Sequence, residues 1–169
     1  MKQIIDKLVV LLLVLMLVAC EKKDEKETVD IEGSKAEVAA VLDKFHSSLK
    51  SKNAGQMNEL LVEDGLYSGT DPTELWDKKT YINYMSKIFA DTTLGVVEYD
   101  IDKRLIHVDK SGVSGYILEQ FEMEKLSPNV PWRMITHLIK EDNTWKIDLI
   151  SYNLTPTNAQ MPAIIKAVN

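Results

Sequence analysis

The spacing of apolar residues changes once along this chain, near Asp91, and this change constrains the fold more than any other feature of the sequence. Before Asp91, apolar residues recur every three or four positions, which is typical of one face of a helix. After it they alternate with polar residues, which is typical of strands with one buried face. Helices followed by consecutive strands predict an α+β fold.

Helix start signals divide the first part into three segments. Ser34 followed by Glu37 forms a capping box, which predicts a first helix over residues 34–51. Asn53 predicts the N-cap of a short second helix, and Asp77 predicts the N-cap of a third. We therefore expect three helices before the sheet.

The second part predicts four long strands. Short polar connections join them, and strands joined so tightly pair as antiparallel hairpins. The expected strands are 94–108, 113–126, 132–140 and 145–154, with a short strand and turn near 64–72 and a last helix over 158–168. We expect that helix to lay Ile164, Ile165 and Val168 on the sheet or over its open end.

The first 19 residues have the layout of a signal peptide. Lys2 and Lys7 precede an unbroken apolar run, Leu8–Ala19, which is shorter than the roughly 20 residues of a membrane-spanning helix. The run ends in Leu-Val-Ala-Cys (17–20), which resembles the lipobox of bacterial lipoproteins. The resemblance implies that Cys20, the single cysteine, receives a diacylglyceryl group and becomes the N-terminus. An ordinary signal peptide or short anchor with an incidental cysteine is the alternative.

Residues 20–33 predict a flexible tether. Six acidic residues and three lysines lie between Glu21 and Glu32, and so polar a segment buries too little surface to offset the entropy of ordering it. Its sequence KKDEK (22–26) resembles the signal that sends some Bacteroidetes lipoproteins to the cell surface. The resemblance implies a protein of the bacterial cell envelope, anchored to the bilayer through Cys20 and exposed at the outer-membrane surface. A plain spacer is the alternative.

The net charge argues against some partners. The chain carries a formal charge of −6, and removal of residues 1–19, with Lys2, Lys7 and Asp6, makes it −7. Nucleic acids and anionic membrane surfaces bind clustered positive charge, and the sequence has no such cluster beyond the tether. Residues 34–169 have the length of one domain with one core.

The order of these elements resembles the SnoaL-like branch of the nuclear transport factor 2 superfamily. The resemblance covers about residues 36–158, and its most specific pieces are GTDPTELW (69–76), PWRMITHLIK (131–140) and WKIDLISYNLTPTN (145–158). It implies a cone, in which a curved antiparallel sheet wraps the N-terminal helices and leaves a pocket at its wide end. It also implies homodimers that pair through the outer face of the sheet. Members include polyketide cyclases, ketosteroid isomerase, dehydratases and pockets without known chemistry, so the fold does not choose the function.

Alternation in two strands predicts a functional site in that pocket. Glu119 alternates with apolar residues in the second long strand, and Arg133 and His137 share one face of the next. If both faces point into the cone, the three side chains converge, and Glu119 or His137 can serve as a base. The alternatives are a cross-strand ion pair between Arg133 and Glu119, and a position of His137 on the outer, dimer-facing side.

Two aromatic residues are expected at the mouth of the cavity. Tyr67 and Trp76 flank the GTDPTELW segment, and both are candidates for ligand contact, although Tyr67 could equally belong to the core. Asp71 suits a turn in which its carboxylate accepts from backbone N–H groups, and Glu74 either bonds nearby backbone groups or points at a ligand. His46 is placed off the main apolar face of the first helix. No pair of histidines has metal-ligand spacing, so neither a metal nor a cofactor is expected.

Two classes of function remain. One is a membrane-tethered module that binds a small apolar or amphipathic molecule in its pocket, or serves as an accessory interaction module. The other is a cofactor-independent isomerase, cyclase, dehydratase or hydrolase with a pocket glutamate or histidine as general base. We favour binding, because no motif fixes a catalytic constellation. An apolar and aromatic pocket lining would favour binding, whereas a buried glutamate within hydrogen-bond reach of His137 or Tyr67 would favour the enzyme.

Overall fold

The computed structural model describes residues 29–93 and 99–168, which contain four helices and one six-stranded sheet. The helices are α2 (Ile31–Lys50), α3 (Ala54–Glu59), α4 (Lys78–Ala90) and α5 (Met161–Val168). The strands are β1 (Leu61–Ser68), β2 (Leu75–Trp76), β3 (Ile101–Val108), β4 (Ser114–Phe121), β5 (Trp132–Glu141) and β6 (Thr144–Leu154). The predicted α+β class is confirmed.

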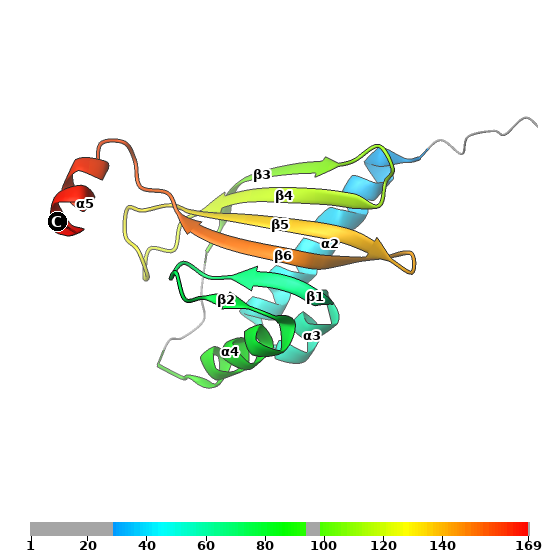
Figure 1. Cartoon of the computed structure of the whole chain (residues 1–169), viewed down its shortest axis with the longest axis horizontal. Coiled ribbons are helices and arrows are strands. Elements are labelled where there is room, and N and C mark those ends of the chain that lie inside the picture. The colour runs from blue at the N-terminus through cyan, green and yellow to red at the C-terminus, as the bar shows by residue number, and fades with distance from the viewer. Residues whose placement is uncertain (1–28, 94–98, 169) are drawn as a thin grey trace, which may run out of the picture.

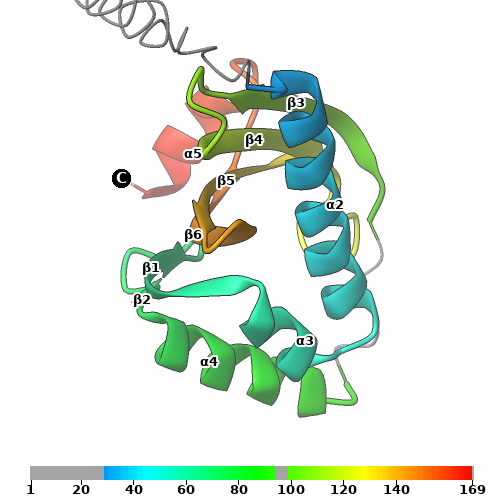
Figure 2. The same cartoon turned by 90° about the vertical axis from the view of Figure 1, so that its right-hand side faces the viewer.

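The sheet has the order β2-β1-β6-β5-β4-β3. Strands β3 to β6 pair antiparallel in sequence order, as predicted, whereas β1 joins the sheet in parallel beside β6. The sheet curves, and α2 crosses its concave side while α3 and α4 lie near the β1 edge (Figures 1 and 2). This is the cone that the sequence resemblance implies.

Two of the three predicted helix starts are confirmed. The side chain of Asn53 accepts from the Gln56 backbone N–H at 2.9 Å, and the side chain of Asp77 accepts from that of Thr80 at 2.7 Å. The predicted start of the first helix at Ser34 is wrong. Helix α2 begins at Ile31, because Asp30 caps it by accepting from the Gly33 N–H at 2.8 Å, and Ser34 is buried inside the helix.

Two predicted strands are longer than the observed ones. Strand β3 begins at Ile101, and residues 94–98 of the prediction lie outside the described part of the chain. Strand β4 ends at Phe121, because the chain turns where Leu126 and Ser127 both donate backbone N–H groups to the carbonyl of Met123.

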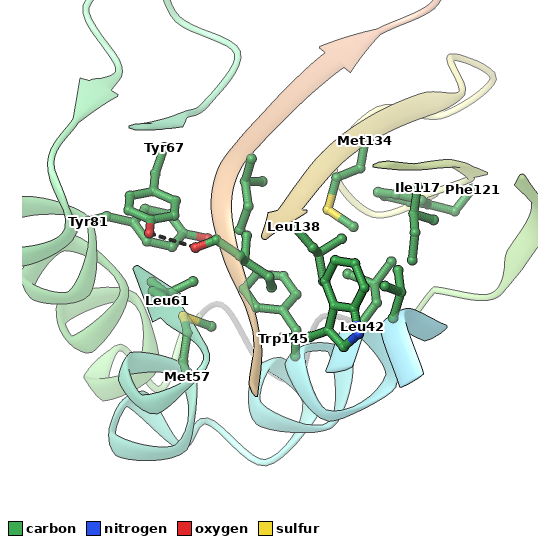
Figure 3. Close-up of a cluster of buried hydrophobic side chains, with 14 of the residues drawn as sticks. Leu42, Met57, Leu61, Tyr67, Tyr81, Ile117, Phe121, Met134, Leu138 and Trp145 are labelled. Carbon is green, nitrogen blue, oxygen red and sulfur yellow. Dashed lines mark hydrogen bonds between the residues drawn. The ribbon is translucent and has the colours of Figure 1, made fainter. Parts of the chain in front are cut away.

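The core lies between α2 and the concave face of the sheet. Val38, Leu42 and Phe45 recur at helical spacing on α2 and are fully buried. They meet the inward-facing residues of the long strands, among them Ile117 of β4 and Leu138 of β5 (Figure 3). Alternation along β4 therefore correctly predicts its buried face, whereas in β5 the buried face is the one opposite to the face expected to point into the cone.

Helix α5 does not lie on the sheet, so the first of the two positions predicted for it is wrong. None of its residues is buried, and Val168 is 78% exposed. The helix lies beyond the end of the sheet, away from α2 and α4 (Figure 1). Its apolar pattern predicts a helix, but not the surface on which the helix packs.

Candidate functional site: an aromatic pocket beside a buried polar chain

A pocket of about 350 Å³ opens at the wide end of the cone. This volume is near the lower end of the range of about 300–1,000 Å³ that is typical of small-molecule sites. Most of its lining is aromatic or aliphatic. The aromatic residues are Trp76, Tyr81, Tyr84, Phe89, Tyr99, Trp132 and Tyr152. The aliphatic residues are Leu49, Met85, Ile88, Met123 and Leu126, and Lys52, Thr70, Glu74 and Lys125 supply polar groups.

The aromatic wall is held by ring-to-ring packing. Trp76 of β2 stacks on Tyr84 of α4 with ring centroids 4.6 Å apart, and its other ring neighbour is Tyr81, at 5.9 Å. Trp132 meets Tyr152 edge to face at 6.5 Å. Such pairs add about 0.5–1.5 kcal/mol each beyond the area that they bury. The wall is therefore fixed by packing before any ligand arrives.

The phenols of the wall are neutral hydroxyl groups at physiological pH. Burial raises the pKa of Tyr81 and of Tyr152, and each phenol interacts electrostatically with the other. Burial, together with the neighbouring Tyr152, also raises the pKa of Tyr99. The Tyr81 hydroxyl has no hydrogen-bond partner of good geometry among the described residues, although it lies near Tyr152. A buried hydroxyl whose hydrogen bond is poorly formed is available to a ligand.

A chain of buried polar groups begins at the pocket wall and ends at the protein surface. The Tyr99 hydroxyl lies 2.5 Å from Nδ1 of His46, and Nε2 of His46 lies 2.7 Å from Oε2 of Glu119. The other carboxylate oxygen of Glu119 accepts from Nε of Arg104 at 2.6 Å. Arg104 in turn donates to the exposed Asp43 at 2.7 Å. Among these five hydrogen-bonded residues, only Tyr99 lines the pocket.

The chemistry of these groups fixes the direction of each hydrogen bond. The Glu119 carboxylate is fully buried beside a guanidinium and only accepts, so Nε2 of His46 must carry a proton. In the neutral imidazole Nδ1 is then an acceptor, and the Tyr99 O–H donates to it. Both ring nitrogens of His46 and both carboxylate oxygens of Glu119 have a partner, which is what burial of such groups requires.

Arg104 compensates the buried charge of Glu119. The two residues lie directly opposite each other on β3 and β4. Burial alone would lower the pKa of Arg104, but the hydrogen bond to Asp43 and the charge of Glu119 outweigh it and raise that pKa. The guanidinium therefore stays charged and holds the carboxylate in place.

Comparison with known proteins agrees with this architecture. The sequence model of the SnoaL-like domain matches residues 38–152, which is most of the chain. The chain belongs to the SnoaL-like domain family. A comparison with curated protein sequences gave no match.

Solved structures share the fold at low sequence identity. An uncharacterised protein with a cystatin-like fold from Caulobacter vibrioides has a TM-score of 0.66 at 7% identity, over 80% of this chain and 99% of that chain. An NTF2-like protein from Pseudomonas putida has a TM-score of 0.62 at 8% identity, over 72% and 87%. A cystatin-like fold protein from Burkholderia xenovorans has a TM-score of 0.62 at 12% identity, over 74% and 94%. At these identities the likeness concerns the fold alone.

In this SnoaL-like domain, the predicted convergence of Glu119 with Arg133 and His137 is wrong. Glu119 pairs with Met134 in the β4–β5 register and points into the cone, so the neighbouring positions of β5 point outward. Arg133 accordingly reaches Gln120 on the outer face, at 3.2 Å, and not Glu119. His137 also lies on the outer face. The alternative that His137 faces outward is therefore the correct one.

The residues expected at the pocket mouth have different positions. Trp76 lines the pocket, and its contact with a ligand stays a prediction. Tyr67 is fully buried in the core, where it stacks on Tyr81 and its hydroxyl bonds the backbone carbonyls of Val62 and Ile147 (Figure 3). Tyr67 is therefore a core residue rather than a residue of the mouth.

The turn that follows β1 is organised by its two carboxylates, as predicted. Glu74 accepts from the backbone N–H groups of Thr70 and Asp71 at 2.9 and 3.0 Å. Asp71 accepts from the backbone N–H of Thr73 at 2.8 Å. Glu74 also contributes to the pocket lining, so this turn shapes one side of the mouth.

The sequence reasoning missed His46 as a site residue. His46 is only 6% exposed and is bonded on both ring nitrogens. It lies four residues after Leu42 and eight after Val38, which is the spacing of one helix face. This spacing could have placed His46 on the buried face of the helix, but histidine is less apolar than the other residues of that face and was not counted with them.

Two further properties concern the described residues alone. Across residues 29–93 and 99–168, no cluster of three or more histidine, cysteine, aspartate or glutamate side chains has an arrangement that could hold a metal ion. Within the same ranges, no helix has the length and apolar character needed to cross a membrane.

Proposed function

We propose that this SnoaL-like domain binds a small, flat, apolar or amphipathic molecule in its aromatic pocket. The observation that supports the proposal is the composition of the pocket wall, to which seven aromatic side chains contribute. Aromatic walls favour ring-bearing or other flat ligands through offset stacking and edge-to-face contacts. Rings that already pack on one another lose little conformational entropy when a ligand binds.

The polar groups of the pocket would orient such a ligand. The Tyr81 hydroxyl is buried and has no well-formed hydrogen bond. A polar atom of the ligand near it would supply the hydrogen bond that water would make if the hydroxyl were exposed. Thr70 and Glu74 belong to the turn at one side of the lining. An amphipathic molecule would therefore place its ring against Trp76 and a polar atom toward these groups.

The binding experiment uses 1-anilinonaphthalene-8-sulfonate as a flat amphipathic probe. We expect saturable binding with one site per chain, measured by probe fluorescence, and a rise in Kd of about tenfold for Trp76→Ala, since loss of an aromatic contact costs roughly 1–2 kcal/mol. Tyr116→Ala is the matched control, because Tyr116 is an exposed aromatic residue of the sheet outside the pocket lining. Equal Kd values for wild type and Trp76→Ala would contradict the proposal.

One observation favours acid–base catalysis as a second candidate. A substrate proton could pass to the Tyr99 oxygen while the Tyr99 proton passes to Nδ1 of His46, and Glu119 would stabilise the resulting imidazolium. Tyr99, His46 and Glu119 follow one another in the order of a catalytic hydroxyl, a histidine and a carboxylate. This series of hydrogen-bonded groups begins at the pocket wall, so a bound molecule could reach Tyr99.

Base-promoted ring opening of 5-nitrobenzisoxazole tests this second candidate, because the reaction needs only a base in an apolar pocket. We expect a rate above that of buffer, and a loss of about a hundredfold in Tyr99→Phe and His46→Gln, which is the lower bound of typical general-base contributions. If both variants keep the wild-type rate, the polar chain is structural and the binding proposal stands alone.

We also propose that the domain is tethered to a membrane of the bacterial cell envelope through lipidated Cys20, and that copies pair through the outer face of the sheet. The support for the tether is the apolar run Leu8–Ala19 with the Leu-Val-Ala-Cys sequence that ends it. These residues lie outside the described part of the chain.

Exposed apolar side chains on the outer face of the sheet, such as Leu105 and Ile135, support the pairing of two copies through this face.

A further inference from the structure

We propose that Ser114, His137 and Asp148 form a second reactive site, on the outer face of the sheet, in which Ser114 is a nucleophile toward activated esters. The three residues come from the adjacent strands β4, β5 and β6. The Ser114 hydroxyl oxygen lies 3.0 Å from Nε2 of His137, and Nδ1 of His137 lies 2.7 Å from Oδ1 of Asp148. A hydroxyl, a base and an orienting carboxylate in this order are the geometric signature of an activated nucleophile.

Proton positions in this cluster follow from the same rule as in the pocket. Ionised Asp148 only accepts hydrogen bonds, so Nδ1 of His137 carries the proton. In the neutral imidazole Nε2 is then an unprotonated acceptor, and the Ser114 O–H donates to it. This tautomer is the one in which His137 can remove the serine proton.

A β-bulge directs Asp148 at His137. In the β5–β6 register His137 pairs with Leu149 and Leu138 pairs with Ile147, which leaves Asp148 as the extra residue. Ile147 and Ile150 both point into the core although they are three positions apart, which regular alternation does not allow. Bulges of this kind re-aim side chains and are frequent beside functional sites. Without it, the carboxylate would be displaced from the imidazole.

The site is open to solvent in the single chain, and the reaction requires that pairing of copies through the outer face leave this end of β4 and β5 uncovered. The side chains of His137 and Asp148 are 36% and 27% exposed, and Ser114 is half-buried at the start of β4. Tyr116 lies directly opposite His137 in the β4–β5 register, stacks on His107 with ring centroids 4.9 Å apart and is 47% exposed, so the exposed part of its ring provides an apolar surface beside the histidine. An aryl group of an ester could rest on this ring.

The reaction is a conventional acyl transfer. The Ser114 oxygen forms a bond to the carbonyl carbon, and its proton moves to Nε2 of His137. The bond to the leaving group breaks, and the alcohol or phenol departs with that proton. Water then attacks the acyl-serine with His137 as base again, which releases the acid and restores the hydroxyl. No oxidant, reductant or metal takes part.

The substrate class follows from the position of Ser114 on a sheet. Strand β4 lies between β3 and β5, so its backbone N–H groups are used in strand pairing rather than in an oxyanion hole. An oxyanion hole contributes about 10²–10³ in rate, and a general base contributes about 10²–10⁴. The site should therefore react with esters that have good leaving groups, such as aryl esters and fluorophosphates, and not with amides.

Phosphorylation of the full chain with diisopropyl fluorophosphate tests the proposal. The serine oxygen displaces fluoride from phosphorus, and the product is stable enough for mass analysis. We expect one adduct, mapped to Ser114, and none at that position in Ser114→Ala. His137→Gln should slow labelling by about a hundredfold, the lower bound of a general-base contribution.

Asp148 is a positioning residue, and its test separates orientation from stability. Asp148→Asn removes the charge that stabilises the imidazolium and should slow labelling at least about tenfold while the thermal transition stays unchanged. Ser151→Ala is the matched control, because Ser151 is a half-buried serine that pairs with Ile135 on the same face. No adduct at Ser114, or labelling that does not change in His137→Gln and Asp148→Asn, would overturn the proposal.

Discussion

Oε2 of Glu119 lies 2.7 Å from Nε2 of His46, and the glutamate that makes this contact is fully buried. The contact joins β4 to α2 across the interior of the cone, over 73 positions of sequence. It connects α2 to β4, the strand next to the β3 edge of the sheet, beside the pocket. We therefore expect it to matter both for stability and for the shape of the site.

Glu119→Ala should destabilise the domain by about 3–5 kcal/mol, because removal of one partner leaves the Arg104 guanidinium and the His46 imidazole without their acceptor. Guanidinium chloride unfolding of the full chain measures the change. Glu119→Gln keeps the volume and one acceptor, so we expect a smaller loss. Glu122→Ala, at an exposed position just after β4, is the control, and a loss no larger than that of the control would contradict the expectation.

Trp145→Ala should cost roughly 3–5 kcal/mol, since the ring is 4% exposed and belongs to the core. Its Nε1–H also donates to Glu37 at 2.8 Å, which joins β6 to α2. The same unfolding measurement applies. A change below about 1 kcal/mol would mean that the ring is not packed as described.

Acidification should weaken the N-cap of α4. Hydrogen bonds from the Thr80 side chain and backbone N–H lower the pKa of Asp77 below its ordinary value of 3.8. A carboxylate whose pKa is lowered by folding stabilises the fold above its unfolded-state pKa, and this contribution is lost as the pH falls through the folded-state pKa.

The measurement is the difference in Tm between wild type and Asp77→Asn from about pH 6 to about pH 2. Asparagine keeps the capping acceptor without titrating, so any advantage of the wild type should shrink as the pH falls. Other carboxylates titrate alike in both proteins and cancel in the difference. A constant difference across this range would contradict the role of Asp77.

Cys20→Ala should abolish lipidation and leave an unprocessed or soluble exported form, because the thiol is the proposed acceptor of the lipid. Intact-mass analysis of the detergent-extracted protein measures the N-terminus and its modification. A mature wild-type chain that begins at an unmodified residue other than Cys20 would end the lipoprotein hypothesis.

Local sequence signals determine much of the fold, because their physical causes act over a few residues. The caps at Asn53 and Asp77 are confirmed, since a side-chain acceptor three residues before a free N–H needs no distant partner. Alternation in β4 correctly places Glu119 and Ile117 on one buried face. The GTDPTELW segment forms the predicted turn through its own carboxylates.

Tertiary structure alone decided which face of β5 is buried. Met134 and Leu138 on one face and Ile135 and Ile139 on the other are all apolar, so the pattern of this strand fits either orientation. Only the register with β4 shows that His137 faces outward, where a bulge in β6 then brings Asp148 to it. A bulge shifts the phase of one strand against its neighbour and leaves no clear mark in the local sequence.

The polar chain of the pocket depended on tertiary structure for the same reason. Tyr99, Glu119 and Arg104 lie more than fifty residues from their partners His46 and Asp43 on α2. Helical spacing could have placed His46 on the buried face, but it could not name the groups that satisfy its two ring nitrogens. A hydrogen bond between distant segments forms only when the sheet wraps the helix, so the sequence determined the elements and their caps, whereas the wrapping of the sheet determined the site.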